Sequence, residues 1–284
     1  MKKIVFLTGT RADFGKIKSL IQTLEEQQDF EAYVFVTGMH LQEIYGYTLI
    51  EIERCNFTNV FTFENHTHET TMDLTLAKTI EGLSNYCKTI NPDMIVVHGD
   101  RVETLAGAIV GSLNNILVAH IEGGEVSGTV DELIRHSVSK LSHIHFVSNK
   151  QAAKRLLQMG EVKESIFTIG SPDIDIMFSS NLPSLETAKK YYVIPFDEYA
   201  LVMFHPVTTE FHSMKQYAID FVDSLFEDNH NYIVVFPNND LGSQYIIDEF
   251  KRLEGNTRFR IFPSLRFEYF LTLLKNSQFI MGNS

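Results

Sequence analysis

The sequence predicts an α/β fold made of parallel βαβ units in two domains. Short apolar, β-rich runs alternate with amphipathic stretches that have helical periodicity. The short runs are apolar throughout, as expected for strands that are covered on both faces. Alternation of strand and helix with short loops is typical of parallel sheets. A length of 284 residues is enough for two domains of ordinary size.

The expected elements fall into two sets. The first set has strands at 3–9, 32–38, 59–63, 93–99, 116–121, 143–148 and 166–170, with helices at 14–27, 41–54 and 70–90 and further helical patterns between the later strands. The second has strands at 200–206, 232–238, 258–264 and 278–284, with helices at 213–227, 243–254 and 266–276. The segment 179–198 has the loosest pattern, so we place the domain boundary there. The predicted domains are 1–180 and 190–284.

The last predicted strand, at 278–284, indicates whether the second domain is complete. It looks like a buried parallel strand, and such a strand needs a covering helix that should follow it in the chain. We therefore expect the second domain to be incomplete at its C-terminal end.

Composition excludes several classes of protein. The formal net charge of −12 argues against broad binding to a phosphate backbone. Cys55 and Cys87 belong to no CxxC or Cys/His set, so no disulfide framework is expected, which suits the cytoplasm. The N-terminal apolar stretch is too short for a signal peptide, and no stretch approaches the roughly 20 apolar residues of a membrane span. We expect a cytoplasmic protein without nucleic-acid or membrane partners.

Candidate ligand-binding residues lie just after the predicted strands. In open parallel sheets, ligands bind beyond the carboxyl ends of the strands. The polar residues at these positions are Arg11, Asp13, His40, Asp100, Arg101, His120, Glu122, Asp131, His205, Asn238, Asp240 and the turn Gly282-Asn283-Ser284. Such consistent placement favours a functional site over random loop polarity.

The stretches TGTRADFG (8–15) and HGDRVET (98–104) each place charges at the start of a predicted helix. The first has a strand–turn–helix context that favours anions, but it is neither GxGxxG nor a Walker motif. Alternatively, Asp13 caps the helix and Arg11 is a solvated cation. Asp100 could likewise cap a helix, or be held beside Arg101 as a general base or sugar-hydroxyl acceptor.

The densest cluster is HIEGGEVSGTVDELIRH (120–136). Two adjacent glycines allow unusual backbone conformations or a close approach. Thr129 could cap a helix that starts near Val130, with Asp131 in its first turn. Asp131 and Arg135 are i,i+4 neighbours that could pair on the helix surface, as are Glu132 and His136. These structural roles leave Glu122 and the glycines unexplained.

No metal site or other cofactor is predicted. His66 and His68 form an HxH pair without a third ligand at a convincing spacing. HExxH and GxSxG motifs are absent from the sequence, as is a nucleophilic cysteine with a histidine partner. The residues alone indicate carboxylates that remove and return protons, and a histidine or arginines that support a leaving phosphate.

Several motifs make the sequence recognisable across nearly its whole length. They are TGTRADFGK, TGMHL, NPDMIVVHGDR, HIEGGEVSGTVDELIRHSVSKLSH, FHPVTTE, FPNNDLGS and FIMGNS. With these motifs the chain resembles the hydrolysing UDP-N-acetylglucosamine 2-epimerases of sialic acid and surface-polysaccharide biosynthesis. The resemblance implies two Rossmann-like, doubly wound domains of GT-B type. It also implies that the family continues for about a hundred residues past a Gly-Asn-Ser-Ser turn.

The resemblance further implies the reaction UDP-GlcNAc + H₂O → ManNAc + UDP through 2-acetamidoglucal. Asp100, Glu122 and Asp131 would then handle protons, with base and acid roles left open. His205 would contact the diphosphate, and Arg11 and Arg101 would hold the substrate. Asn238, Leu265, Phe270 and Ser284 match UDP-binding positions. A homodimer or higher homo-oligomer is implied as well.

Three alternatives remain open at this point. The same carboxylates could act on a UDP- or GDP-linked 2,4-diacetamido-trideoxy sugar of a legionaminic-type pathway. A non-hydrolysing epimerase would share the fold, although the GGEVSGTVDE block favours the hydrolysing branch. A non-catalytic sugar-nucleotide-binding module would bind UDP and be indifferent to Asp100→Asn or Glu122→Gln.

Overall fold

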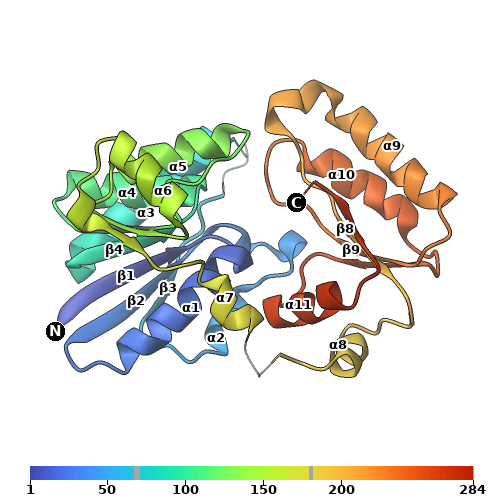
Figure 1. Cartoon of the computed structure of the whole chain (residues 1–284), viewed down its shortest axis with the longest axis horizontal. Coiled ribbons are helices and arrows are strands. Elements are labelled where there is room, and N and C mark those ends of the chain that lie inside the picture. The colour runs from blue at the N-terminus through green and yellow to red at the C-terminus, as the bar shows by residue number, and fades with distance from the viewer. Residues whose placement is uncertain (67–70, 179–181, 284) are drawn as a thin grey trace. The chain divides into compact units, whose positions relative to one another are not determined.

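The computed structural model describes residues 1–66, 71–178 and 182–283, which divide into two compact units (Figure 1). The first unit comprises Met1–Glu43 and Tyr47–Ile174, and the second comprises Ile44–Gly46 and Asp175–Ser284. Each unit is built around a parallel sheet, which confirms the predicted α/β class with two doubly wound parts.

The first unit has a sheet of seven strands in the order β3-β2-β1-β4-β5-β6-β7, with parallel pairing throughout. The strands are β1 (Lys2–Thr8), β2 (Phe30–Val36), β3 (Val60–Thr62), β4 (Met94–His98), β5 (Leu117–Ile121), β6 (Ile144–Val147) and β7 (Ile166–Thr168). Each corresponds to a predicted strand. The order reverses between β1 and β4, which makes this pair the topological switch point of the sheet.

The helices of the first unit join these strands. They are α1 (Arg11–Glu25), α2 (Leu49–Glu53), α3 (Met72–Ile90), α4 (Val102–Leu113), α5 (Val130–Lys140) and α6 (Lys150–Gln158), with α7 (Asp173–Met177) where the chain passes to the second unit. The helix predicted at 41–54 is instead two short 3₁₀ turns followed by α2. Gly46 and Tyr47 have φ of 85° and 44°, which a continuous right-handed helix cannot include.

Both faces of the central strands of this sheet are buried. Alternate residues of each strand point to opposite faces, so Val5 and Leu7 belong to one core cluster and Ile4 and Phe6 to the other. Helices α3, α4 and α5 cover the first face, and α1 and α2 cover the second (Figure 1). This double cover explains why the strands are apolar throughout.

The second unit repeats this organisation with four parallel strands in the order β10-β9-β8-β11. The strands are β8 (Ala200–Met203), β9 (Tyr232–Val235), β10 (Phe259–Phe262) and β11 (Ile280–Gly282), and the helices are α8 (Leu185–Tyr191), α9 (Met214–Glu227), α10 (Ser243–Phe250) and α11 (Phe267–Lys275). Its switch point lies between β8 and β11, because β9 and β10 extend the sheet on the other side of β8.

Helix α8 formed where the sequence showed its weakest pattern. Ser184 caps it by accepting a hydrogen bond from the Thr187 N–H at 3.1 Å. Ala188 is fully buried and packs with Ile194 and Phe196 in the core of the second unit. The helix is seven residues long, too short for its periodicity to stand out.

None of the helices within the described residues is long and apolar enough to cross a membrane.

The buried face of α3 should carry much of the first unit's stability. Leu83 is fully buried, whereas Leu113 on α4 is 76% exposed. Leu83→Ala should lower the free energy of unfolding by about 2–5 kcal/mol, because it leaves a cavity in a packed core. Leu113→Ala, the matched control, should change it by less than about 0.5 kcal/mol. Urea denaturation followed by circular dichroism measures both, and equal losses would contradict this description of the core.

Candidate active site

The carboxyl ends of β1, β4 and β5 bring charged side chains together at the switch point of the first unit. Thr10 caps α1, accepting from the Asp13 N–H at 3.2 Å, so the alternative in which Asp13 is the cap is wrong. The Asp13 carboxylate instead lies 3.3 Å from Nδ1 of His98, the last residue of β4. Glu122, directly after β5, lies on the other side of that imidazole.

His98 is held between two carboxylates. Its Nδ1 is 3.3 Å from Asp13 Oδ1 and its Nε2 is 3.1 Å from Glu122 Oε2. Burial alone would lower the pKa of His98, but hydrogen bonds and charge from the two carboxylates outweigh burial and raise it to about 9. The ring is therefore an imidazolium at neutral pH and donates from both nitrogens.

Glu122 accepts four hydrogen bonds. Oε1 accepts from Lys16 Nζ and Ser171 Oγ, both at 2.7 Å, and Oε2 accepts from Lys16 Nζ at 2.8 Å and His98 Nε2 at 3.1 Å. Burial opposes ionisation of this carboxyl, but the bonds and charges of His98 and Lys16 hold its pKa far below the usual range. All lone-pair positions of the carboxylate are thus used.

A second carboxylate holds Lys16 from the opposite side, since Asp173 Oδ2 lies 2.9 Å from Lys16 Nζ. The result is a row of alternating charges, Asp173–Lys16–Glu122–His98–Asp13, which we call the charge chain. Its five side chains are only 8–18% exposed. Burial of each charge is tolerated because at least one oppositely charged partner lies beside it.

The glycine pair after Glu122 is required for close packing. A Cβ on Gly123 would lie 2.8 Å from His120 Nδ1, and one on Gly124 would lie 2.6 Å from the Ala152 carbonyl oxygen. Gly124 has φ of 76°, and Glu122 itself has φ of 60°, a conformation that side-chain-bearing residues rarely adopt. The glycines let the chain turn sharply while the Glu122 side chain points into the charge chain.

His120 supports the same turn from the core. It is fully buried, and its Nε2 donates to the Gly99 carbonyl at 2.8 Å. Burial lowers the pKa of His120 to about 3, so this ring is neutral. It braces the β4 and β5 ends without carrying charge.

Asp100 and Arg135 form a second charged group beside the charge chain. Arg135 donates through NH2 to Asp100 and through NH1 to the Glu122 carbonyl at 2.9 Å. Asp100 does not cap α4, whose cap position is Arg101. Burial raises the pKa of Asp100, and repulsion from Asp131 and Asp13 adds to this, so the net shift is upward despite Arg135.

Asp131 lies in the first turn of α5. As expected, Thr129 caps this helix, and its hydroxyl donates to Asp131 Oδ2 at 2.9 Å. Arg135 pairs with Asp100 rather than with Asp131, so an i,i+4 pair does not explain that arginine. The Asp131 carboxylate lies close enough to Asp100 for its negative charge to raise the pKa of Asp100.

The two predicted substrate-binding arginines follow β1 and β4. Arg11 NH2 lies 3.9 Å from Glu51 Oε1, and Arg101 Nε lies 3.6 Å from Glu103 Oε2. Both side chains are less than one-fifth exposed, at 17% and 19%. Their substrate-binding roles stay predictions.

His40 is fully buried, and both its ring nitrogens are used within the first unit. Nε2 lies 3.0 Å from Thr8 Oγ1 and Nδ1 lies 2.7 Å from Thr48 Oγ1. Burial lowers the pKa of His40 to about 4. In this structure the ring links the end of β1 to α2, and its predicted substrate contact is not tested.

His205 and Asn283 follow β8 and β11, the switch-point strands of the second unit, and Asn238 follows the neighbouring β9. The Asn283 side chain accepts from the His205 N–H at 2.8 Å and donates to its carbonyl at 3.0 Å. The Asn238 N–H donates to His205 Nδ1 at 3.0 Å. Because Nδ1 accepts, the ring hydrogen of His205 must be on Nε2, which makes Nε2 a donor.

The other predicted site residues of the second unit lie in several different environments. Asp240 accepts from the Asn238 side chain at 2.6 Å. Leu265 is buried, and Phe270 packs against the same core cluster. Gly282 pairs with Met203, whose carbonyl oxygen would be 1.8 Å from a Cβ at this position. Ser284 lies outside the described residues.

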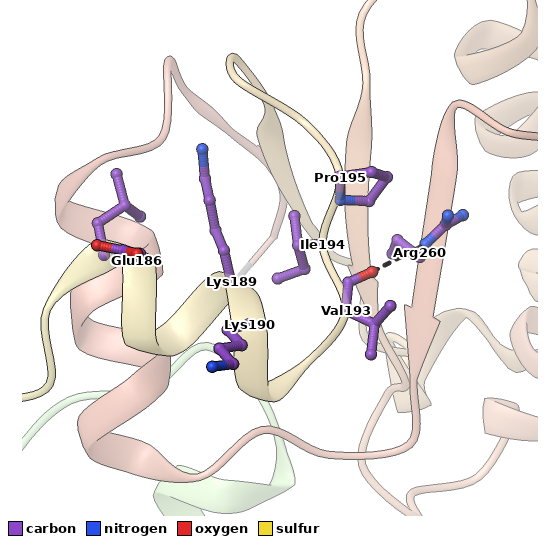
Figure 2. Close-up of a pocket in the computed structure, with 8 residues that line it drawn as sticks. Glu186, Lys189, Lys190, Val193, Ile194, Pro195 and Arg260 are labelled. Carbon is purple, nitrogen blue, oxygen red and sulfur yellow. Dashed lines mark hydrogen bonds between the residues drawn. The ribbon is translucent and has the colours of Figure 1, made fainter.

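The second unit also has a hollow of about 770 Å³ on the side of α8 (Figure 2). It is lined by Leu185, Glu186, Lys189, Lys190, Val193, Ile194, Pro195 and Arg260. Arg260 Nε donates to the Val193 carbonyl at 3.3 Å, and Lys189 Nζ donates to the Asp197 carbonyl at 3.2 Å. The lining offers one carboxylate and mostly apolar surface, so we place the proton chemistry in the first unit instead.

Among residues 1–66, 71–178 and 182–283, no cluster of three or more His, Cys, Asp or Glu could hold a metal ion. His66 bonds to Gln42 at 2.9 Å and to the Gly38 carbonyl at 3.1 Å. His68 lies outside the described residues.

Sequence reasoning missed several residues of this site. They are Lys16, His98, Ser171 and Asp173, while Arg135 was left open. Two signals could have found two of them. Lys16 follows Asp13 by three residues, which places both on one side of a helix, and His98 is the polar end of an otherwise apolar strand.

Comparison with known proteins agrees with the fold. Residues 22–284 match the family described as UDP-N-acetylglucosamine 2-epimerase. The chain is 51% identical over its full length to the UDP-N-acetylglucosamine 2-epimerase of Neisseria meningitidis serogroup B, covering 75% of that protein. It is 34% identical, again over its full length, to the Legionella pneumophila UDP-N,N'-diacetylbacillosamine 2-epimerase (hydrolyzing), covering 76% of it.

Among solved structures, the chain is similar to UDP-GlcNAc 2-epimerase from Methanocaldococcus jannaschii, which was determined in complex with UDP-GlcNAc and UDP. The TM-score is 0.81 at 23% identity, covering 100% of this chain and 79% of that one. This likeness concerns the fold. Together these findings define a two-unit α/β protein of the GT-B-like class. The chain belongs to the UDP-N-acetylglucosamine 2-epimerase family.

The protonation state of His98 is a direct test of the charge chain. Its ¹⁵N signals should report an imidazolium at pH 7 and titrate near pH 9, while His40 and His120 stay neutral. Loss of the signal in His98→Gln assigns it. Because the fold raises the pKa of His98, the charged ring contributes its full stabilisation of the fold below the unfolded pKa of about 6.5. This contribution is lost as the pH rises towards 9. A His98 that titrates near 6.5 would contradict the chain.

Proposed function

We propose that this protein is a hydrolysing UDP-N-acetylglucosamine 2-epimerase that converts UDP-GlcNAc and water to ManNAc and UDP. The observation that carries the proposal is the arrangement of Asp100, Glu122 and Asp131 around one sheet edge, each in a different environment. Full-length identity of 51% to the Neisseria epimerase supports the substrate.

The reaction needs a base, an acid and stabilisation of charge. A base removes the C2 proton while the C1–O bond breaks, which releases UDP and leaves 2-acetamidoglucal. In the second step a proton returns to C2 from the opposite face, and water adds to C1 with loss of a proton. Positive charge develops at C1 as the double bond takes the proton. An ionised carboxylate, a protonated carboxyl and a fixed negative charge would serve these needs.

The three environments suggest a division of roles. Asp131 accepts one hydrogen bond from a side chain in the part of the chain that the structure describes, so its carboxylate is the best placed to accept the C2 proton. We assign Asp100 the return of a proton to C2, because burial and the nearby charges of Asp131 and Asp13 raise its pKa. Glu122 uses every lone pair and stays ionised, so we assign it the stabilisation of positive charge at C1.

His205 would assist the leaving group. Its Nε2–H is a hydrogen-bond donor, and donors stabilise negative charge that develops on a departing diphosphate. Family likeness supports Arg11 and Arg101 as substrate-holding residues, and Asn238, Leu265, Phe270 and Ser284 as UDP-binding positions. These roles rest on the resemblance.

A second candidate is the same chemistry on a 2,4-diacetamido sugar nucleotide. The observation in its favour is the 34% identity to the Legionella enzyme, whose name specifies both that substrate and hydrolysis. The higher identity of 51% to the Neisseria relative favours UDP-GlcNAc.

Turnover in D₂O, followed by proton NMR, decides between these functions. With UDP-GlcNAc we expect free UDP and ManNAc carrying deuterium at C2, because the proton returned to C2 comes from solvent. Accumulation of UDP-ManNAc would show a non-hydrolysing epimerase. Turnover of only the diacetamido sugar nucleotide would favour the second candidate, and binding of UDP without turnover of either would overturn catalysis.

Two variants test the roles of base and acid. Asp131→Asn should slow UDP release by about 10²–10⁴-fold, the usual contribution of a general base. Asp100→Asn should still release UDP but accumulate 2-acetamidoglucal, because hydration lacks its proton donor. Glu132→Gln, one position along α5 and paired with His136 at 3.8 Å, is the matched control and should be nearly as active as the wild type. The reverse pattern would exchange the two roles.

A further inference from the structure

Two residues near the end of the first unit contact Glu122 and Lys16 of the charge chain. Ser171 Oγ donates to Glu122 Oε1 at 2.7 Å, and Asp173 Oδ2 lies 2.9 Å from Lys16 Nζ. The chain leaves the first unit after Ile174, so both residues lie just before the passage to the second unit. They follow β7, the edge strand furthest in the sheet from β1.

We propose that Ser171 and Asp173 are positioning residues that fix the Lys16 ammonium and the Glu122 carboxylate for the reaction. The inference rests on the proposed function, since it assumes that Glu122 acts in catalysis. Neither residue needs to touch the substrate, because each acts through a partner.

The geometry of Glu122 explains why two anchors are needed. Lys16 Nζ lies 2.7 Å and 2.8 Å from the two carboxylate oxygens, so it forms a symmetric bridge that leaves rotation about the carboxylate axis open. Bonds from Ser171 to Oε1 and from His98 to Oε2 fix the plane of the group. Without the Ser171 donor, one of the two plane-fixing bonds is lost.

Asp173 acts one step further away. Lys16 is a long, flexible side chain with several rotamers, and ordering it costs conformational entropy. A second carboxylate on its far side restricts the ammonium to one position between Asp173 and Glu122. The backbone of Glu122 is separately held by Arg135, and His98 by Asp13, so Asp173 supplies the anchor at the open end of the chain.

A double-mutant cycle on kcat tests Asp173. Asp173→Asn and Lys16→Met should each lower kcat by about 10–100-fold with little change in KM, as expected for misplacement of a reacting group. Because Asp173 acts only through Lys16, the double variant should match Lys16→Met within about twofold, a departure from additivity that marks coupled residues. Asp175→Asn, an exposed carboxylate in the same helix, is the charge-matched control and should leave kcat unchanged.

Ser171 is tested by restoring its hydroxyl. Ser171→Ala should lower kcat, and Ser171→Thr, which keeps a donor, should recover most of the loss. Multiplicative losses in the cycle, an Asp173→Asn effect no larger than that of Asp175→Asn, or a failure of Ser171→Thr to recover activity would overturn the proposal.

An activity-independent measurement separates this proposal from the proposed function. The cycle is run on whichever nucleotide sugar the wild type converts. If it converts none, the proposed function fails, and ¹⁵N NMR of the Lys16 ammonium still reports the anchor. A protected Lys16 signal that disappears in Asp173→Asn but persists in Asp175→Asn would support the positioning, and a signal unaffected by either would refute it.

Discussion

The structure of the first unit depends on how a carboxylate is kept ionised inside it. Glu122 is 12% exposed, and removal of a charge from water is expensive unless opposite charges and donors replace the solvent. The charge chain meets this demand with three acids and two cations, which leaves a net charge of −1. Loss of either cation would leave an uncompensated carboxylate, so the five residues act as one group.

Sheet topology explains how residues far apart in sequence form this group. Parallel strands end at a common edge, and strand order reverses between β1 and β4 in the first unit and between β8 and β11 in the second. Residues just after those strands therefore converge in each unit. The first edge presents carboxylates and the second presents the donor Nε2–H of His205. The same topological rule therefore gathers polar side chains at one edge of each sheet.

The sequence predicted the strands and the main acids because both depend on local pattern. Continuous apolar runs located every strand, and position after a strand located Asp100, Glu122 and Asp131. The partners of Glu122 were not predicted, because Lys16 is 106 residues away and Ser171 is 49 residues away. No sequence periodicity relates positions so far apart, and they become neighbours only when the sheet forms. Helix α8 was missed for the opposite reason, since its seven residues are too few for a clear local signal.

The hydrogen bond from the Asn238 N–H to His205 Nδ1 has a chemical consequence for selectivity. A neutral imidazole has one lone pair in the ring plane that can coordinate a metal, and here that lone pair is engaged by the backbone. Nε2 carries the ring hydrogen instead. This histidine therefore offers a hydrogen-bond donor and is a poor ligand for zinc or copper ions.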